Sequence, residues 1–405
     1  MPATLSHPEQ SRAPAPERIR SERPYASRIV IDDQMWAEVI ENPADLQSYL
    51  QGWNELARAA VVPNVFYEPW FLRPAIEYLH SGKPLRFVFI YRKNKRISDP
   101  DILCGFFPLE RTRIKLFPAE SWRLMTDSYL YLSQPLLHVE YTNEAVLGFL
   151  RWARLARIPL IELSRSRAEG PYLHALTTAF RQLEITPFIY EQTTRALLVR
   201  EDGPAVVSQK RGHYRRDIQR RRRRLEENGA VEVRYLNSSD DLEEWQQNFL
   251  RLERVGWKGE SGTAIALHEN ETRMFLETTT AAMQQGHLQM LGLYFEGAPI
   301  AIKCNLCSEE GSYAWRIAFD ESYARYSPGV QLELDNMECF RRTPLKWMDS
   351  CATADHPMIN RLWPHRLGLQ SLYVPTCGLL SDIYCSTRPL LRITKRRLKA
   401  LLGRR

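Results

Sequence analysis

Three polar residues in the second half of the chain are of types that could move a proton or hold a charged group. Asp349 and His356 follow an apolar segment, and Arg316 alternates with small residues in Ser312–Phe319. Histidine accepts a proton near neutral pH and a carboxylate can orient it, so Asp349 and His356 are candidates for general-base chemistry. A buried arginine needs an anionic partner, so Arg316 is either a third catalytic candidate or half of a salt bridge, with Asp349 as the expected partner.

A turn before an expected helix is the candidate anion site. The turn reads Arg-Tyr-Ser-Pro-Gly and leads into a helix expected over Val330–Arg341. The N–H groups and positive dipole end of a helix N-terminus favour phosphate, and Gly329 would let a ligand approach the backbone closely. Serine and proline also begin ordinary helices, so a purely structural role is the alternative. The phosphate-binding candidates are Arg325, Ser327, Gly329, Val330 and Gln331.

The segment Trp257-Lys258-Gly259 lies between two expected helices and is the third candidate. A charged lysine among glycines is typical of a loop beside a ligand, so Trp257 and Lys258 are candidate substrate contacts. The alternative is that Trp257 packs in the core. Cys304 and Cys307 are spaced like half of a zinc site, but positions three apart on a strand point to opposite faces. No second pair follows, so we expect no metal.

The elements that would position these residues recur twice along the chain, with strands predicted by period-two alternation and helices by amphipathic spacing. In the first half we expect a helix over Phe66–Leu79, strands over Leu85–Tyr91, Ile102–Phe107 and Arg113–Phe117, a helix over Glu144–Leu155 and a strand over Pro159–Leu163. In the second half we expect helices over Leu242–Arg254 and Glu269–Gln285, strands over Leu288–Phe295, Ile300–Cys307 and Ser312–Phe319, a helix over Val330–Arg341 and a strand over Leu345–Asp349. The fold class is therefore α/β (α+β), with two tandem domains, each a mixed, mostly antiparallel sheet flanked by helices.

The second half also resembles a known family. Leu252–Gly259 reads LERVGWKG and Ala318–Gly329 reads AFDESYARYSPG, and a basic helix precedes both. Together these segments resemble the GNAT-type acyltransferases of the CelD-like, cellulose-biosynthesis group, which are related to the Fem transferases of peptidoglycan bridges. The resemblance covers about residues 205–375. The first half fits as a degenerate GNAT-like partner, through Phe66–Pro69 and Gly105–Leu109.

This resemblance implies transfer of an acyl group from acyl-CoA, either acetyl-CoA or a longer one, to an amine or hydroxyl. It also implies that the strands Ser312–Phe319 and Leu345–Asp349 part to admit the pantetheine arm, with the pyrophosphate at Tyr326–Val330. By the same analogy the acceptor is a sugar, glycolipid or exopolysaccharide precursor. The family signature has a small residue where this chain has Gln331, so a Fem-like aminoacyl-tRNA donor is the second hypothesis. A catalytically inactive scaffold at the membrane surface is the third, and DNA is not an expected partner.

Positive charge is concentrated in two segments. The net charge is +7, yet Lys210–Arg224 and Arg388–Arg405 each carry a local +8, so the rest of the chain is acidic. The first segment belongs to a helix expected over residues 209–227, which is either a packed connector or a site for tRNA, an anionic glycan or a membrane. The second alternates leucines with basic residues, as would a helix on an anionic membrane, and a frayed terminus is the alternative.

The expected organisation is a disordered arm at 1–25, a first domain at 26–204, the active domain at 205–380 and a basic tail at 381–405. No apolar stretch approaches the roughly 20 residues that span a bilayer, and the arm lacks the apolar core of a secretory signal. The seven cysteines are sparse and odd in number, which fits a reducing compartment. We therefore expect a cytoplasmic protein, with a peripheral position at the inner face of the membrane as the alternative.

Overall fold

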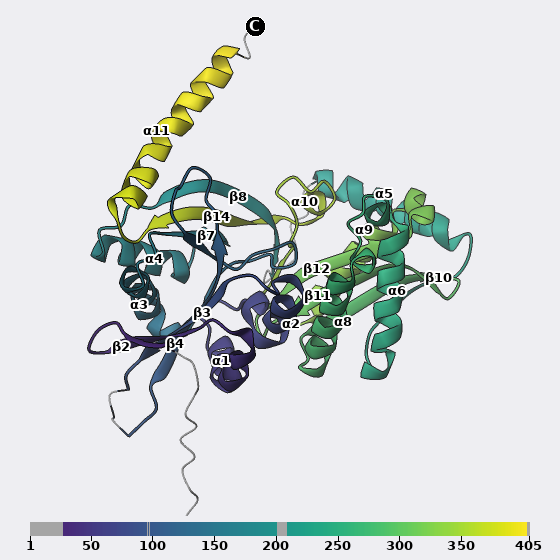
Figure 1. Ribbon diagram of the computed structural model, residues 1–405. Helices are drawn as coiled ribbons and strands as arrows, with labels where there is room; N and C mark the ends of the chain where they lie inside the picture. Colours follow the sequence, from purple (N-terminus) through teal and green to yellow (C-terminus); the bar gives the residue numbers. More distant parts are fainter. Residues whose placement is uncertain (1–26, 95, 97, 201–208, 403–405) are drawn as a thin grey trace, which may run out of the picture.

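Fourteen strands form one continuous sheet that runs through both halves of the chain (Figure 1). The structure is a computed structural model, which describes residues 27–94, 96, 98–200 and 209–402. The strand order is β1-β2-β3-β4-β5-β7-β14-β8-β13-β12-β11-β10-β9, and β6 pairs with β4. Neighbouring strands on this path are antiparallel, except that β5 with β7 and β12 with β13 are parallel.

The first half contributes β1 (Ser27–Val30), β2 (Met35–Ile40), α1 (Leu50–Arg58), α2 (Pro69–Leu79), β3 (Leu85–Arg92), β4 (Ile102–Thr112), β5 (Ser121–Leu124), β6 (Leu136–Leu137), α3 (Thr142–Leu155), β7 (Leu160–Arg167), α4 (Pro171–Gln182) and β8 (Phe188–Val199). The second half contributes α5 (Gln209–Glu226), β9 (Val231–Tyr235), α6 (Leu242–Val255), α7 (Trp257–Glu260), α8 (Glu269–Gln284), β10 (Leu288–Phe295), β11 (Ala298–Cys307), β12 (Gly311–Phe319), α9 (Pro328–Arg342), β13 (Trp347–Asp349), α10 (Ile359–Leu362), β14 (His365–Pro375) and α11 (Leu379–Leu402).

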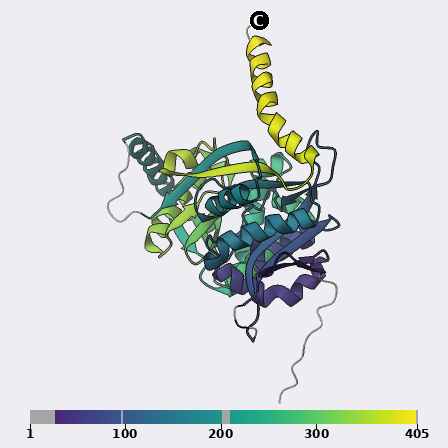
Figure 2. The ribbon, with the colours of Figure 1, turned by 90° about the vertical axis from the view of Figure 1, so that its left-hand side faces the viewer.

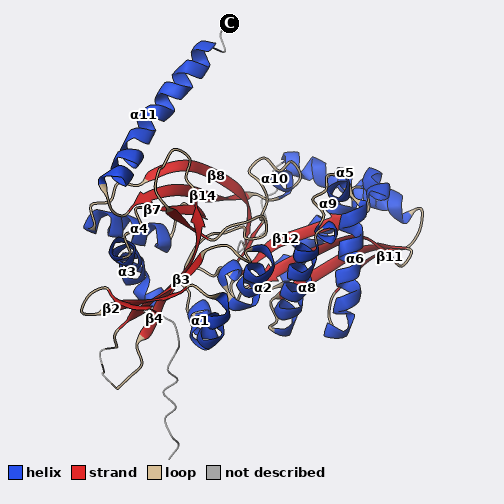
Figure 3. Cartoon of the chain, viewed as in Figure 1, coloured by secondary structure: helices blue, strands red, loops and turns tan. Residues whose placement is uncertain are grey.

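The order of elements agrees with the repeated pattern in the sequence, and the expected class of helix-flanked, mostly antiparallel sheets is confirmed (Figure 3). One expected strand is wrong. Residues 113–117 are not extended, because Leu116 has a left-handed φ of 65° within a turn. The chain instead continues β4 as far as Thr112 and pairs it with β5. The expected arm at 1–25 and the expected boundary at 204 and 205 lie outside the described residues.

The two halves exchange strands at the centre of the sheet. β8, from the end of the first half, pairs with β13 of the second half, and β14, from the second half, pairs with β7 of the first. β8 and β14 also pair with each other over most of their length. The hydrogen bonds of each half are therefore completed by a strand from the other half.

A single hydrophobic core extends under both halves. Helix α2 packs against α8, and the ring of Phe71 meets Trp315 of β12 edge to face at 5.6 Å. The Tyr313 hydroxyl donates to the carbonyl of Pro63 at 2.8 Å. On the opposite face of the second-half sheet, Lys303 and Asn305 of β11 meet α9. Tyr313 and Trp315 of β12 are thus held by contacts with the first half of the chain, whereas the other face of the sheet is held by α9 of the second half.

We predict that residues 209–405 alone do not form a stable, cooperatively folded unit. This fragment lacks β8, so β13 and β14 would each expose an unpaired edge, and edges of that kind associate with other chains. Size-exclusion chromatography and thermal unfolding followed by circular dichroism would show aggregation without a cooperative transition. Adding residues 27–200 as a separate chain should restore a soluble complex. A monomeric fragment that unfolds cooperatively would contradict the proposed dependence on β8.

Candidate functional site

Strands β12 and β13 part soon after they meet. Their parallel pairing covers only Gly311–Tyr313 against Trp347–Asp349, whereas β12 continues to Phe319. Beyond Tyr313, the edge of β12 that faces β13 is therefore left without a ladder on that side, while β11 pairs along its other edge. Backbone groups that no strand pairs are available to a ligand that lies alongside.

A cavity of about 550 Å³ lies at this opening. Its walls come from the free part of β12, the beginning of α9, the segment after β13 and the loop around α7. The lining residues that carry the argument below are Tyr131, Glu253, Lys258, Lys303, Arg316, Ser327, Gly329, Val330, Glu333, Cys351 and His356. Six of the residues predicted from sequence are among them, namely Arg316, Lys258, Ser327, Gly329, Val330 and His356. Arg325, Gln331 and Asp349 do not line the cavity, and the side chain of Trp257 lies outside the described part of the chain.

The start of α9 forms one end of the cavity. Ser327 takes a left-handed φ of 56° before the helix, and its carbonyl accepts from the N–H groups of Val330 and Gln331. A Cβ atom on Gly329 would lie 3.2 Å from the ring of Phe319, so this glycine lets the start of α9 pack closely against β12 at the cavity wall. The Gln331 side chain donates to the carbonyl of Tyr326 at 2.8 Å and thus fastens the turn.

Lys258 is held at the cavity wall by a buried carboxylate. Its Nζ lies 2.5 Å from Glu253, whose other oxygen accepts from the backbone N–H of Ile265 at 2.8 Å. Burial lowers the pKa of the Lys258 amine, although the Glu253 carboxylate opposes that shift. A Cβ on Gly259 would come within 1.7 Å of the carbonyl oxygen of Arg254, so the tight loop requires glycine there. The sequence signalled Lys258 but not Glu253, which lies in an otherwise ordinary amphipathic helix.

A loop from the first half supports Arg316. The guanidinium of Arg316 stacks over the ring of Tyr129 at 4.2 Å and donates to the carbonyl of Ser128 at 3.4 Å. The neighbouring Trp315 donates its indole N–H to the carbonyl of Tyr129. The expected salt bridge between Arg316 and Asp349 is wrong. Arg316 forms no ion pair with a carboxylate in the described part of the chain, which leaves it directed at the cavity.

Asp349 instead belongs to the strand exchange. Its carboxylate forms a buried ion pair with Arg195 of β8 and accepts from the N–H of Cys351 at 3.0 Å. Arg195 also donates to the carbonyl of Tyr131 at 2.7 Å. These contacts use the carboxylate to join β13 and β8, whereas His356 remains on the cavity wall.

His356 lies near a second buried ion pair. Lys303 Nζ is 2.7 Å from Glu333, whose carboxylate also accepts from the Trp363 indole at 3.1 Å. Burial lowers the pKa of His356, Lys303 adds to that shift, and Glu333 opposes it. The imidazole is therefore neutral at neutral pH, and its Nδ1 accepts from the backbone N–H of Ile359 at 3.4 Å, a long contact that uptake of a proton by this nitrogen would displace. One indication of Lys303 was present in the sequence, because a lysine there interrupts the apolar pattern of a strand. The same pattern would also fit a lysine that faces solvent, so the buried ion pair could not be predicted from it.

The corresponding gap in the first half is filled by the chain itself. β5 and β7 pair in parallel only through Ser121–Arg123 and Leu160–Glu162. Beyond them, the N–H of Ser133 donates to the carbonyl of Arg165 at 3.4 Å, so the segment after β5 covers the free edge of β7. Residues 125–134 therefore occupy the space that stays open in the second half.

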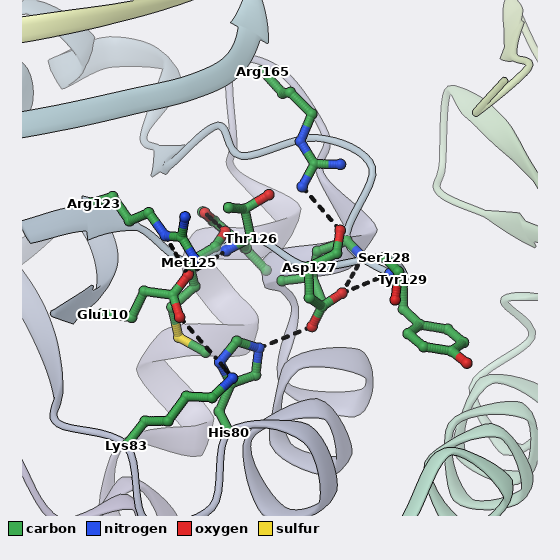
Figure 4. Close-up of polar contacts among 12 residues, drawn as sticks. His80, Lys83, Glu110, Arg123, Met125, Thr126, Asp127, Ser128, Tyr129 and Arg165 are labelled. Carbon is green, nitrogen blue, oxygen red and sulfur yellow. Dashed lines mark hydrogen bonds and ion pairs between the residues drawn. The ribbon is translucent and has the colours of Figure 1, made fainter. Parts of the chain in front are cut away.

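A buried histidine fastens this segment (Figure 4). His80 Nε2 lies 2.8 Å from Asp127, and its Nδ1 lies 3.3 Å from Glu110, which also pairs with Arg123 at 2.8 Å. Asp127 in turn accepts from the N–H groups of Tyr129 and Leu130. Burial alone would lower the pKa of His80, but hydrogen bonds to Asp127 and Glu110 raise it above its ordinary value. Burial would raise the pKa values of both carboxyls, and His80 brings them below their ordinary values instead.

Comparison with known families identifies part of this arrangement. Residues 212–356 match the family model described as "Acetyltransferase (GNAT) domain". This span contains β12, α9, β13 and most of the cavity wall, so the cavity lies largely within the part of the chain that matches this acetyltransferase model. No curated protein sequence matches the chain.

Two of the similar solved structures, with TM-scores of 0.50 or more, share the overall fold. FemX is 9% identical with a TM-score of 0.53, and the match covers 85% of this chain and 98% of FemX. A conserved protein of unknown function from Bacteroides thetaiotaomicron is 10% identical with a TM-score of 0.50, over 80% of this chain and 97% of that one. A tandem GNAT protein from the clavulanic acid biosynthesis pathway is 13% identical with a TM-score of 0.43, over 84% and 99%.

Replacing His80 with glutamine should destabilise the protein by about 3 kcal/mol near pH 5.5, because Asp127 would lose its cationic partner and Glu110 would keep only Arg123. The raised pKa of His80 means that its stabilisation is complete below the ordinary histidine value of about 6.5 and is lost as the pH rises through the raised one. The lowered carboxyl pKa values confine the effect to pH above about 4. Urea unfolding of the wild type and His80→Gln across this range measures the difference.

The exposed His174 provides the matched control, and His174→Gln should change the unfolding free energy by less than about 0.5 kcal/mol. A His80→Gln effect that stayed the same from pH 5 to pH 9 would show that packing, rather than charge, explains the role of His80.

Proposed function

We propose that this chain is a CelD-like acyltransferase that moves an acyl group from acyl-CoA to an amine or hydroxyl acceptor. The observation that supports it most strongly is the parting of β12 and β13 over a cavity that ends at the start of α9. A thioester arm with amide groups can pair with the free edge of β12, as another strand would. The small side chains of Ala314 and Ala318 leave room for it at the cavity wall.

The phosphates of the donor would lie at the turn before α9. Backbone N–H groups and the helix dipole favour anions there. A separate surface groove beside this turn is lined by Arg220, Arg221, Arg224 and Arg325, together with Asp217, Glu227, Asn228 and Tyr326. Asp217 pairs with Arg220 and Arg221, so the four arginines outnumber the two carboxylates without being unopposed. Arg221 donates to the Ser327 hydroxyl at 3.0 Å and so links the basic helix α5 to the turn. The groove supplies positive charge where the charged end of the donor would leave the cavity.

His356 is the proposed general base. In the proposed reaction the acceptor nitrogen or oxygen attacks the thioester carbonyl, and its proton passes to His356 directly or through water. The C–S bond then breaks, and the CoA thiolate leaves and takes the proton from the His356 imidazolium, directly or through water. A backbone N–H of β12 would polarise the carbonyl oxygen. Burial raises the pKa of the Cys351 thiol well above its ordinary value. That cysteine therefore stays protonated, and direct transfer needs no covalent enzyme intermediate.

We place the acceptor among sugars, glycolipids and exopolysaccharide precursors. The end of the cavity near His356 offers Lys303, Glu333 and the Ser350 segment, which suit a molecule rich in hydroxyl groups. The second candidate is an aminoacyl-tRNA donor, which the arginines of the α5 groove favour. We prefer acyl-CoA because most of the cavity wall belongs to the part of the chain that matches the acetyltransferase family model.

Replacing Gly329 with valine should weaken binding of acetyl-CoA by at least 100-fold. The added side chain would press against Phe319 and force the start of α9 away from β12, which would displace the turn that is proposed to hold the phosphates. Isothermal titration calorimetry with acetyl-CoA and a longer acyl-CoA measures the effect. Gly212→Val is the matched control, because this glycine also lies in a helix and a Cβ there meets nothing within 4 Å.

If the wild-type protein bound aminoacylated tRNA but neither acetyl-CoA nor the longer acyl-CoA, the second candidate would be favoured. Binding of acyl-CoA that is equally tight in Gly329→Val and wild type would place the donor elsewhere.

Replacing His356 with glutamine should lower kcat by about 100- to 1,000-fold with little change in the affinity for acyl-CoA, as expected for loss of a general base. Because the pKa of His356 lies below its ordinary value, wild-type activity should be level above about pH 6.5 and fall as the imidazole becomes protonated. Initial rates from pH 5 to pH 8 with acceptors drawn from the proposed classes measure this profile. A His356→Gln variant that retained both the rate and the acidic fall would exclude this role.

A further inference from the structure

Helix α11 extends from the body of the protein, as Figures 1 and 2 show from two directions. Its first turns are anchored. Ser381, Tyr384 and Cys385 are buried, the Tyr384 hydroxyl donates to the carbonyl of Lys115 at 2.8 Å, and Arg388 donates to the same carbonyl at 2.8 Å. Beyond Arg388 the helix continues to Leu402 away from the sheet. Helix α11 is thus attached to the rest of the protein through its first turns, and its remainder projects from the surface.

The side of α11 opposite its anchor is apolar and exposed. Leu379 is 75% exposed, Leu380 61%, Ile383 49% and Leu390 68%. These are the most closely grouped of the large apolar side chains that are exposed in the described part of the chain. Their exposure costs free energy in water, and a contiguous exposed apolar surface indicates contact with another apolar phase.

The sequence continues this pattern to the end of the helix. At about 100° per residue, positions 379, 380, 383, 390, 391, 398, 401 and 402 fall within roughly 140° of one another, and all are leucine or isoleucine. Positions 388, 392, 395 and 399, all arginine or lysine, fall in the adjoining sector of about 60°. Arg397, Thr387 and Thr394 are the exceptions within the apolar sector. From Arg388 onward the chain has eight basic residues and no acidic one.

We propose that α11 binds an anionic lipid surface, lying in the plane of the membrane with its leucines in the acyl boundary and its basic residues at the headgroups. No helix in the described residues is long and apolar enough to cross a bilayer, so α11 would lie on the membrane surface. A nucleic acid would match the basic residues but leave the leucines in water. An anionic membrane matches both sectors, and the inference stands whether or not the chain transfers acyl groups.

Co-sedimentation of the full chain with vesicles tests the proposal. Binding to phosphatidylcholine vesicles with about 30% phosphatidylserine should be tight, and binding to pure phosphatidylcholine at least 100-fold weaker. The charge variant Arg392→Gln/Lys395→Gln/Lys399→Gln should bind the anionic vesicles on the order of 100-fold more weakly, since each basic residue near the surface contributes about fivefold. The apolar variant Ile383→Ser/Leu390→Ser keeps every charge and should also bind at least 10-fold more weakly.

The matched control is Arg341→Gln/Arg342→Gln/Lys346→Gln, which removes the same charge from exposed positions near the end of α9. This variant should bind anionic vesicles within twofold of the wild type. Circular dichroism and thermal unfolding should be unchanged in all three variants.

Several results would overturn the proposal. The first is failure of the wild type to bind anionic vesicles. The second is a loss of binding in the control variant as large as that in the charge variant, and the third is full binding by the apolar variant. Either of the last two results would show that the contact depends on nonspecific charge alone. If the wild type did not bind vesicles but formed a dimer, and if Ile383→Ser/Leu390→Ser dissociated that dimer, the apolar surface would instead bind a second copy of the chain. Retention of tRNA by the wild type, with no binding to vesicles, would assign the basic residues to nucleic acid.

Discussion

The exchange of β8 and β14 determines what the rest of the molecule can do. β13 has only three residues, and it is held by β12 on one edge and by β8 on the other. The ion pair between Arg195 and Asp349 is buried between these strands, where separation of the charges would cost about 3–5 kcal/mol. Because β13 has only three residues and is held along both edges, it pairs with β12 only at its beginning. The rest of β12 therefore has no strand beside it on that edge, which leaves the opening between the two strands. The cavity thus depends on a strand from the half that does not contain it.

The two halves use the same topology for different purposes. In the second half the gap between parallel strands is left open and lined by Lys258, Arg316 and His356. In the first half the chain closes the equivalent gap with residues 125–134, and the charged network of His80, Glu110 and Asp127 holds that segment. The same segment then carries Tyr129 under Arg316. The segment that fills the gap in the first half thus also forms part of the wall of the cavity in the second, so both halves contribute to one cavity.

The sequence predicted the local elements well and their assembly only in part. β11 and β12 alternate clearly, and the turn before α9 has recognisable residues, so the cavity's main walls could be foreseen. β8 contains Glu191, Gln192, Thr193 and Thr194 in succession, which conceals its strand character, and its pairing partners lie more than 140 residues away. Pairing at that distance leaves no local periodicity to detect. The ion-pair partner of Asp349 could not be predicted for the same reason, because Arg195 belongs to the strand that the sequence concealed.

Amide hydrogen exchange with and without acetyl-CoA would test the central claim, that the parted strands of the second half receive the donor. Added acetyl-CoA should slow exchange at the free edge of β12, residues 314–319, and at residues 329–331 of α9. Residues 125–134, which fill the equivalent gap, should be unaffected except through Tyr129 and Tyr131. Protection confined to the first half, or absent from β12 at saturating acetyl-CoA, would contradict the account.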